Sequence, residues 1–265
     1  NKKDGFDLVE TSACNFYDGV TQSEVEEYYA SKKNPDDKEP LSYGLNTTVK
    51  KCDGRVVEEV WRIGAKYGAA IEKIVYWLEM ASTVAENDKQ RSVIDALIKY
   101  YKSGDLADFN EYCIKWVDEK ESAVDFINGF IEVYDDPLGM KGTWEGLVEY
   151  RDVEGTRRTR VISDNAQWFE DHSPVDSRFK KQQVKGVSAN VICAATLGGG
   201  EYPSTAIGIN LPNADWIRAS HGSKSVTISN IISAYNEASR GNGFDEEFVI
   251  DEETIELIRQ YGDIC

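Results

Sequence analysis

The chain has 265 residues and carries 30 Lys and Arg against 47 Asp and Glu, so its formal net charge is −17. This length suffices for one large domain or two small ones, and the 11% aromatic content argues against disorder. The acidic balance disfavours binding to a nucleic-acid backbone, because no excess of Lys and Arg is available to release counterions. No apolar run approaches the ~18 residues that a membrane-spanning helix needs, so we expect neither nucleic acid nor membrane as a partner.

The N-terminal part predicts a short helix followed by a β-hairpin. A capping-box pattern opens residues 21–33, and apolar residues then recur on one helical face. Residues 47–63 contain Asp53-Gly54 between two segments rich in β-branched residues, and this pair suits a tight hairpin turn. The same segments would also suit a helix.

The middle of the chain predicts a helical block. Apolar residues recur at helical spacing in four successive segments, 69–85, 91–102, 105–120 and 122–128. Such a block must bury its apolar faces against another layer of structure.

The pattern then changes to strands. Residues 129–134 and 144–150 alternate apolar and polar side chains, and the turn-rich connection 135–142 between them favours two paired strands. Residues 154–182 are charged and predict helix, with a break at Ser173-Pro174.

The last third of the chain adds further elements of both kinds. We expect strands at 187–197 and 205–210, and helices at 225–239 and 251–261. Because proline has no N–H to donate, Pro212 indicates that the second strand lies at a sheet edge or ends there. The sum is an α+β fold, in which a helical block is followed by a small sheet with helical insertions.

The sequence offers little for a metal centre or a nucleophile. His172 and His221 are the only histidines, and neither lies in a zinc motif or at ligand spacing from a cysteine. No nucleophile elbow or phosphate-binding loop is present. A Cys–His dyad stays open, although nothing in the sequence singles one out. We therefore expect no metal site in this chain, and no residue stands out as catalytic.

Polar side chains next to predicted strands are the remaining candidates. Glu132 and Tyr134 share one face of a strand, and Asn210 and Asn213 follow another. A carboxylate with amide oxygens nearby would bind an ammonium group through charge-assisted hydrogen bonds, and an edge strand can accept an extended peptide. Two simpler interpretations stay open: a solvent-facing Glu132 and an ordinary asparagine-containing turn.

Two longer motifs resemble one known family. Residues 129–146 read GFIEVYDDPLGMKGTWEG and residues 208–213 read GINLPN. In this order they resemble two marker segments of the dipeptidyl peptidase III family, bacterial-type members included. The resemblance runs from residue 70 to the C-terminus.

The resemblance implies a two-lobed zinc exopeptidase that removes dipeptides from the N-terminus of short peptides. The family's zinc ligands lie in H-E-x-x-G-H and E-E-x-R-A-[ED] motifs, and neither motif occurs in this sequence. The first would follow Cys265. We therefore expect a fragment: zinc in the full-length parent, none bound to this chain, and no hydrolysis by the chain alone.

The resemblance also implies substrate-binding roles. Glu132 would bind the α-ammonium group of a peptide, with the two asparagines as its amide partners. Tyr134 would be a subsite residue, and Glu145 matches an acidic position near the cleft. The backbone of 206–210 would pair with the extended peptide. The complete set is Glu132, Tyr134, Glu145, Ala206, Gly208, Ile209, Asn210 and Asn213.

The family's architecture implies how the chain divides between the two lobes. Residues 1–152 and 194–239 would belong to a peptide-binding lobe with a mixed, barrel-like β-core. Residues 153–193 and 240–265 would be partial helical pieces of the zinc lobe, and the missing remainder of that lobe would be a partner. We expect a cytoplasmic compartment. The alternative function is a non-catalytic peptide-binding module with the same cleft.

Overall fold

The computed structural model describes residues 5–184, 187–203, 205–239, 243, 247–249 and 251–261. It divides into two compact units, each built from three separate segments of the chain. Unit 1 comprises residues 1–123, 127–146 and 212–222, and unit 2 comprises residues 124–126, 147–211 and 223–265. These units differ in their boundaries from the lobes that the sequence predicts, so the division into lobes stays a prediction.

A three-stranded sheet opens unit 1. Its order is β1 (Tyr17–Asp18), β2 (Thr47–Cys52) and β3 (Arg55–Val60), with β1 parallel and β3 antiparallel to β2. The predicted hairpin is confirmed, because Asp53 and Gly54 both have positive φ, as its tight turn requires. Helix α1 (Gln22–Ala30) begins at the predicted capping box.

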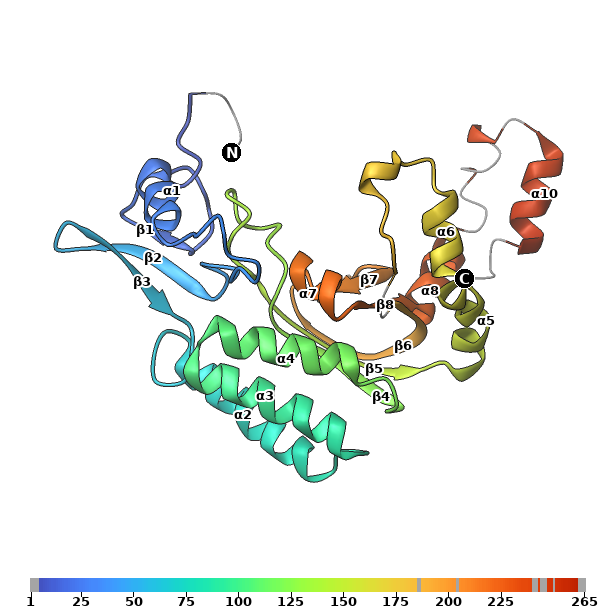
Figure 1. Ribbon diagram of the computed structural model, residues 1–265, viewed down its shortest axis with the longest axis horizontal. Helices are drawn as coiled ribbons and strands as arrows, with labels where there is room; N and C mark the ends of the chain where they lie inside the picture. Colours follow the sequence, from blue (N-terminus) through green and yellow to red (C-terminus); the bar gives the residue numbers. More distant parts are fainter. Residues whose placement is uncertain are drawn as a thin grey trace. The chain divides into compact units, whose positions relative to one another are not determined.

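Three helices make the predicted helical block in unit 1. They are α2 (Gly68–Thr83), α3 (Asp88–Ser103) and α4 (Leu106–Asp118), which lie side by side in Figure 1. Their shared core includes Leu97, Tyr100 and Trp116, all buried. A short helix that the sequence analysis did not predict, α7 (Asp215–Ser220), also belongs to this unit.

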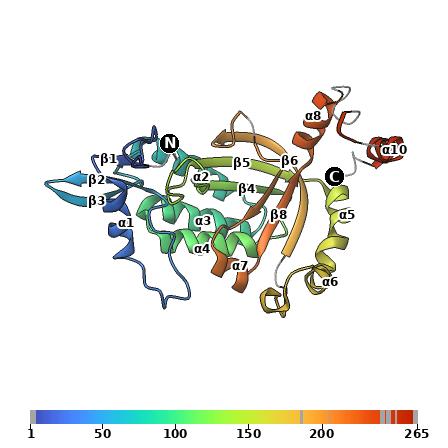
Figure 2. The ribbon, with the colours of Figure 1, turned by 90° about the horizontal axis from the view of Figure 1, so that it is seen from above.

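A five-stranded mixed sheet follows. Its order is β4 (Val124–Phe130), β5 (Trp144–Arg151), β6 (Val187–Gly199), β8 (Ser223–Ile228) and β7 (Gly208–Leu211). In unit 2, β8 lies beside β6, its parallel neighbour (Figure 2). Its other neighbour, β7, is antiparallel to it. The described strands form an open sheet with β4 and β7 at its edges, so the barrel-like core is not observed and the predicted edge position of β7 is confirmed.

The helices of unit 2 follow the predicted pattern. The charged stretch contains α5 (Val153–Asp164), α6 (Ala166–His172) and the short 3-10 helix η1 (Ser177–Phe179). Towards the C-terminus, unit 2 contains α8 (Ser229–Ser239) and α10 (Glu252–Tyr261).

Several predicted boundaries differ from the structure, among them that of the strand expected at 205–210, which runs over Gly208–Leu211. Residues 122–128 are not a helix, because β4 begins at Val124 in the middle of them. Residues 225–228 belong to β8, and the predicted helix starts only at Ser229. Strand β4 ends at Phe130, so Glu132 lies beyond the strand rather than inside it. For residues 122–128 and 225–228, cross-strand pairing outweighs a short apolar pattern that fits helix and strand alike.

The architecture is α+β, as the sequence predicts. Among the described residues, no helix is long and apolar enough to cross a membrane.

Candidate functional site

Glu132 is held by its backbone just after β4. Its N–H donates to Oε1 of Glu145 (3.1 Å), and its C=O accepts from the N–H of Thr143 (2.8 Å) and from the Thr143 hydroxyl (3.2 Å). Both peptide groups of Glu132 are therefore satisfied by residues at the start of β5. This leaves its half-buried side chain to make contacts of its own.

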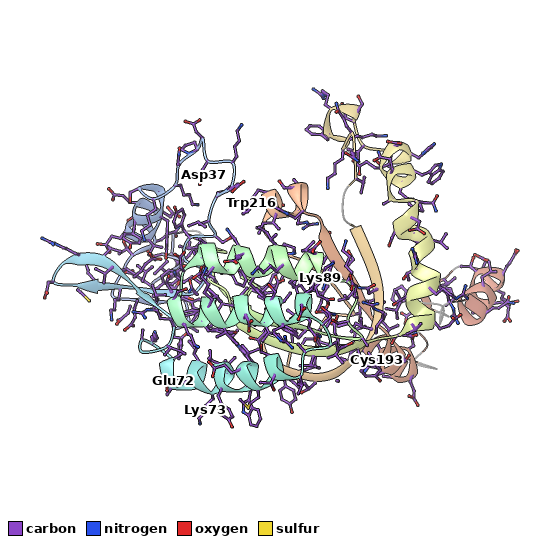
Figure 3. All side chains as sticks on the ribbon, turned by 60° about the horizontal axis from the view of Figure 1, so that its bottom comes forward. Asp37, Glu72, Lys73, Lys89, Cys193 and Trp216 are labelled. Atoms are coloured by element: carbon purple, nitrogen blue, oxygen red, sulfur yellow. The ribbon has the colours of Figure 1, made fainter. Side chains whose placement is uncertain are left out.

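The carboxylate of Glu132 meets one of the two predicted amides. Nδ2 of Asn213 donates to Oε1 of Glu132 over 3.1 Å, although the two residues lie 81 positions apart. Asn213 precedes α7, where the indole of Trp216, labelled in Figure 3, donates to the carbonyl of Pro40 (3.2 Å). The segment that carries Asn213 is thus attached to unit 1.

The Glu132–Asn213 pair keeps hydrogen-bond acceptors that a ligand could use. In the part of the chain that the structure describes, Oε2 of Glu132 accepts no hydrogen bond. Asn213 is exposed. A half-buried carboxylate beside an amide is an arrangement that binds ammonium groups by charge-assisted hydrogen bonds.

Glu145 and Tyr134 lie in contrasting surroundings. Glu145 is 4% exposed, and its carboxylate is used by the N–H of Glu132 and the hydroxyl of Thr143 (3.4 Å). Tyr134 is 88% exposed. The contacts of Glu145 support the backbone of Glu132, whereas Tyr134 is accessible from solvent.

The other predicted residues lie on edge strand β7 in unit 2. The C=O of Ile207 accepts from the N–H of Ile228 (2.9 Å), so the alternation of an antiparallel ladder turns Ile209 and Leu211 towards β8 as well. The backbone groups of Gly208 and Asn210, and of Ala206 just before the strand, therefore point away from the sheet. The side chain of Asn210 accepts a hydrogen bond from the Ser225 hydroxyl (3.2 Å).

Sequence reasoning missed the buried polar network behind the connection 135–142. Asp136 is 4% exposed and Lys141 is fully buried. Nζ of Lys141 donates to the Tyr29 hydroxyl (2.8 Å), the Thr47 hydroxyl (3.0 Å) and the carbonyl of Gly44 (3.2 Å). No local signal identifies these residues, because charged residues in a turn-rich segment are normally solvated.

Burial shifts the proton equilibria of this network. It lowers the pKa of Lys141 to about 8, although the nearby carboxylates of Glu58 and Asp136 favour the charged form. Burial also raises the pKa of Tyr17 and of Tyr29, with Asp136 and Glu58 as the respective carboxylate neighbours, so both phenols stay protonated as hydrogen-bond donors.

A cavity of about 840 Å³ lies within unit 1. Its walls include the aromatic side chains of Phe16, Trp61, Tyr67, Phe130 and Trp144. Glu132 and Asn213 are not among its lining residues, so the Glu132–Asn213 pair does not coincide with this cavity.

No metal centre forms among the residues that the structure describes. Nowhere in those residues do three His, Cys, Asp or Glu side chains come together in a way that could hold an ion. The zinc that the family resemblance implies therefore does not fit the described residues, and no chemical step through it can be assigned to them.

A comparison with known protein families identifies the family of this chain. Residues 19–263 match peptidase family M49. The chain belongs to this family. Family M49 membership confirms the resemblance to dipeptidyl peptidase III on which the sequence-based roles rest.

Curated relatives of this M49 chain are named dipeptidyl peptidase 3. It is 31% identical over 191 residues to dipeptidyl peptidase 3 of Dictyostelium discoideum, covering 71% of this chain and 26% of that protein. It is 26% identical over 166 residues to the Homo sapiens protein of that name, covering 63% and 22%. The chain thus spans about a quarter of the length of these curated relatives.

Solved structures share the fold. Dipeptidyl-peptidase III from Corallococcus sp. strain EGB has a TM-score of 0.69 and 24% identity, covering 83% of this chain and 40% of that one. DPP III from Caldithrix abyssi has a TM-score of 0.73 and 20% identity, covering 92% and 45%. The M49 chain therefore corresponds to less than half of each solved relative.

Proposed function

We propose that this chain is the peptide-recognition part of a zinc-dependent dipeptidyl-peptidase that removes dipeptides from the N-terminus of short peptides. Membership of family M49 and the names of its relatives support the reaction class. The observation that carries the proposal for this chain is the Glu132–Asn213 pair. Short peptides with a free N-terminus are the proposed ligands.

Glu132 would bind the α-ammonium group of the peptide. One oxygen of its carboxylate is oriented by Asn213, and the other would accept from the ammonium group. A charge-assisted hydrogen bond of this kind contributes about 1.5–3 kcal/mol. Because the ammonium group marks the first residue, this contact would set which peptide bond reaches the hydrolytic centre.

Strand β7 would bind the peptide backbone. The outward groups of Ala206, Gly208 and Asn210 form an open edge, and an extended peptide can pair with such an edge through main-chain hydrogen bonds. Main-chain pairing contributes affinity without selecting side chains, which suits an enzyme acting on varied short peptides.

The remaining roles complete the proposal. Asn210 would be the second amide partner of the amino end, Tyr134 would cover a side-chain subsite, and Glu145 would act near the peptide through its contact with Glu132. The zinc ligands and the hydrolytic step would belong to residues outside this chain, in the remainder of the zinc lobe. The chain alone is expected to bind no stoichiometric zinc, and the proposed compartment is the cytoplasm.

Kinetics of the full-length M49 protein that contains this chain would test the proposal. Dipeptidyl-naphthylamide hydrolysis should proceed in the wild type. Glu132→Ala should lower kcat/KM by about 10²-fold, which corresponds to loss of about 3 kcal/mol of binding in the transition state. Zinc content, measured by elemental analysis, should not change.

Each outcome of the kinetic experiment bears on one part of the proposal. An inactive full-length wild type would contradict the peptidase and favour a non-catalytic peptide-binding module. An active wild type with an unchanged kcat/KM in the variant would contradict the role of Glu132. Loss of zinc in the variant would mean that Glu132 acts on the metal centre instead.

A further inference from the structure

The position of the Glu132 carboxylate depends on contacts made after β4 has ended. Strand pairing no longer holds the chain there, so the bonds to Thr143 and Glu145 must hold it. These partners follow the connection 135–142 along the chain. The conformation of that connection therefore decides whether they meet Glu132 in register.

One buried carboxylate organises this connection. Asp136 accepts from three backbone N–H groups of its own loop, those of Leu138 (3.3 Å), Met140 (2.8 Å) and Lys141 (3.0 Å). The hydroxyl of Tyr17 donates to both of its oxygens, at 2.8 and 2.9 Å. Asp136 thus fixes the loop internally and attaches it to β1.

The end of the loop is also attached to the body of unit 1. Lys141 donates to acceptors on α1 and in the 44–47 segment, and the N–H of Gly142 donates to the carbonyl of Leu45 (2.8 Å). Thr143 follows directly and bonds Glu132. The loop therefore has fixed points at both ends, with Asp136 at the first and Lys141 at the second.

We propose that Asp136 is a positioning residue for the recognition of peptide amino ends. By closing the loop, it brings Thr143 and Glu145 onto the backbone of Glu132 and so directs the Glu132 carboxylate. This inference rests on the proposed function of Glu132. Asp136 itself does not contact the peptide.

A matched pair of variants separates positioning from general stability. Asp136→Ala removes the carboxylate that closes the loop. The control, Glu119→Ala, removes another buried carboxylate of unit 1, which accepts from the N–H groups of Glu121 (2.9 Å) and Ser122 (3.0 Å) away from Glu132. Both changes should destabilise unit 1, because each removes a buried acceptor of backbone N–H groups, so a positioning role would distinguish them.

The first measurement is amide hydrogen exchange of Glu132 and Thr143 in the 265-residue chain. Asp136→Ala should accelerate exchange of both amides by about tenfold or more relative to the Glu119→Ala control. Without the hydrogen bonds of Asp136, local opening of the loop costs less free energy. Equal protection in the two variants would overturn the proposed positioning, whatever the ligand of Glu132 is.

The second measurement is the preference for a free amino end. Titration calorimetry would compare a tripeptide with its N-acetylated form in both variants and in Tyr17→Phe. The preference of the wild type should fall about tenfold in Asp136→Ala, fall less in Tyr17→Phe, and persist in the control. A preference lost equally in the control, or kept in Asp136→Ala, would overturn the inference. A wild type without any preference would instead reject the proposed function of Glu132.

Discussion

Lys141 in unit 1 and Glu149 in unit 2 are both buried charged-type side chains, and their surroundings differ. Lys141 in unit 1 donates to three acceptors, and its Nζ lies 5.4 and 5.0 Å from the ring centroids of Tyr17 and Tyr29. Glu149 on β5 in unit 2 is 1% exposed, and neither of its carboxyl oxygens has a hydrogen-bond partner among the described residues. Two charged residues lie near Glu149. They pair with each other, with Nζ of Lys224 2.7 Å from Oδ2 of Asp125.

The two sites titrate at a similar pH from opposite directions. Burial and the charge of Asp125 raise the pKa of Glu149 to about 8, despite the opposing effect of Lys224. Burial lowers the pKa of Lys141 to about 8. At neutral pH, Glu149 therefore holds a proton and is neutral, whereas Lys141 is charged and hydrogen-bonded. In unit 1, the buried charge of Lys141 fixes a loop through its hydrogen bonds. In unit 2, the buried Glu149 lacks such partners and is neutral.

Glu149→Gln should produce the largest effect on stability. The pKa of Glu149 rises on folding from 4.5 to about 8, so its stabilising contribution is complete below pH 4.5 and is lost as the pH rises to 8. A glutamine cannot ionise. The variant should match the wild type at pH 4 and exceed it by about 5 kcal/mol at pH 8, at about 1.4 kcal/mol per pH unit.

Hydrogen exchange of the β5 and β6 amides across this pH range would measure the effect of Glu149→Gln. Parallel pH profiles for the variant and the wild type would contradict the assignment of a neutral, buried Glu149.

Lys141→Met should have the next largest effect, with the opposite sign. The change leaves three buried acceptors without their donor, so unit 1 should lose about 3 kcal/mol at pH 8. The pKa of Lys141 falls on folding from 10.5 to about 8, so wild-type stability rises between pH 8 and 10.5 and the deficit of the variant should widen there. Denaturant unfolding at pH 8 and 10 would measure this, and a deficit that narrows with pH would contradict it.

Tyr17→Phe should have a smaller effect. The variant loses one hydroxyl that donates to the buried Asp136 carboxylate, which costs about 2 kcal/mol. Tyr28→Phe is the matched control, since its half-buried hydroxyl reaches Glu58 only over 3.3 Å. Thermal unfolding should show a clearly larger loss for Tyr17→Phe, and equal losses would contradict the role of Asp136 as the centre of the loop.

Local patterns were sufficient for elements with strong turn or capping chemistry. Asp53-Gly54 predicted the hairpin and Pro212 predicted the edge strand, because both act through the backbone of their own segment. Residues 122–128 and 225–228 were misread as helix, since short apolar runs suit either state until a partner strand is known.

The candidate site shows the same division between local and distant information. Their chemistry suggested Glu132 and Asn213 as partners and the resemblance to a family supported the pairing, because no periodicity connects residues 81 positions apart. Asp136, Lys141 and Glu149 escaped notice because a charged residue is normally exposed, and only the assembled fold shows that these are buried.

The central claim is that Glu132 recognises a free peptide amino end. Titration calorimetry of the 265-residue chain with a tripeptide and its N-acetylated form tests it most directly, with Glu132→Gln as the isosteric control. The claim predicts about tenfold or greater preference for the free amino end in the wild type, and none in the variant. Equal binding of the two peptides by the wild type, or no binding of either, would contradict it.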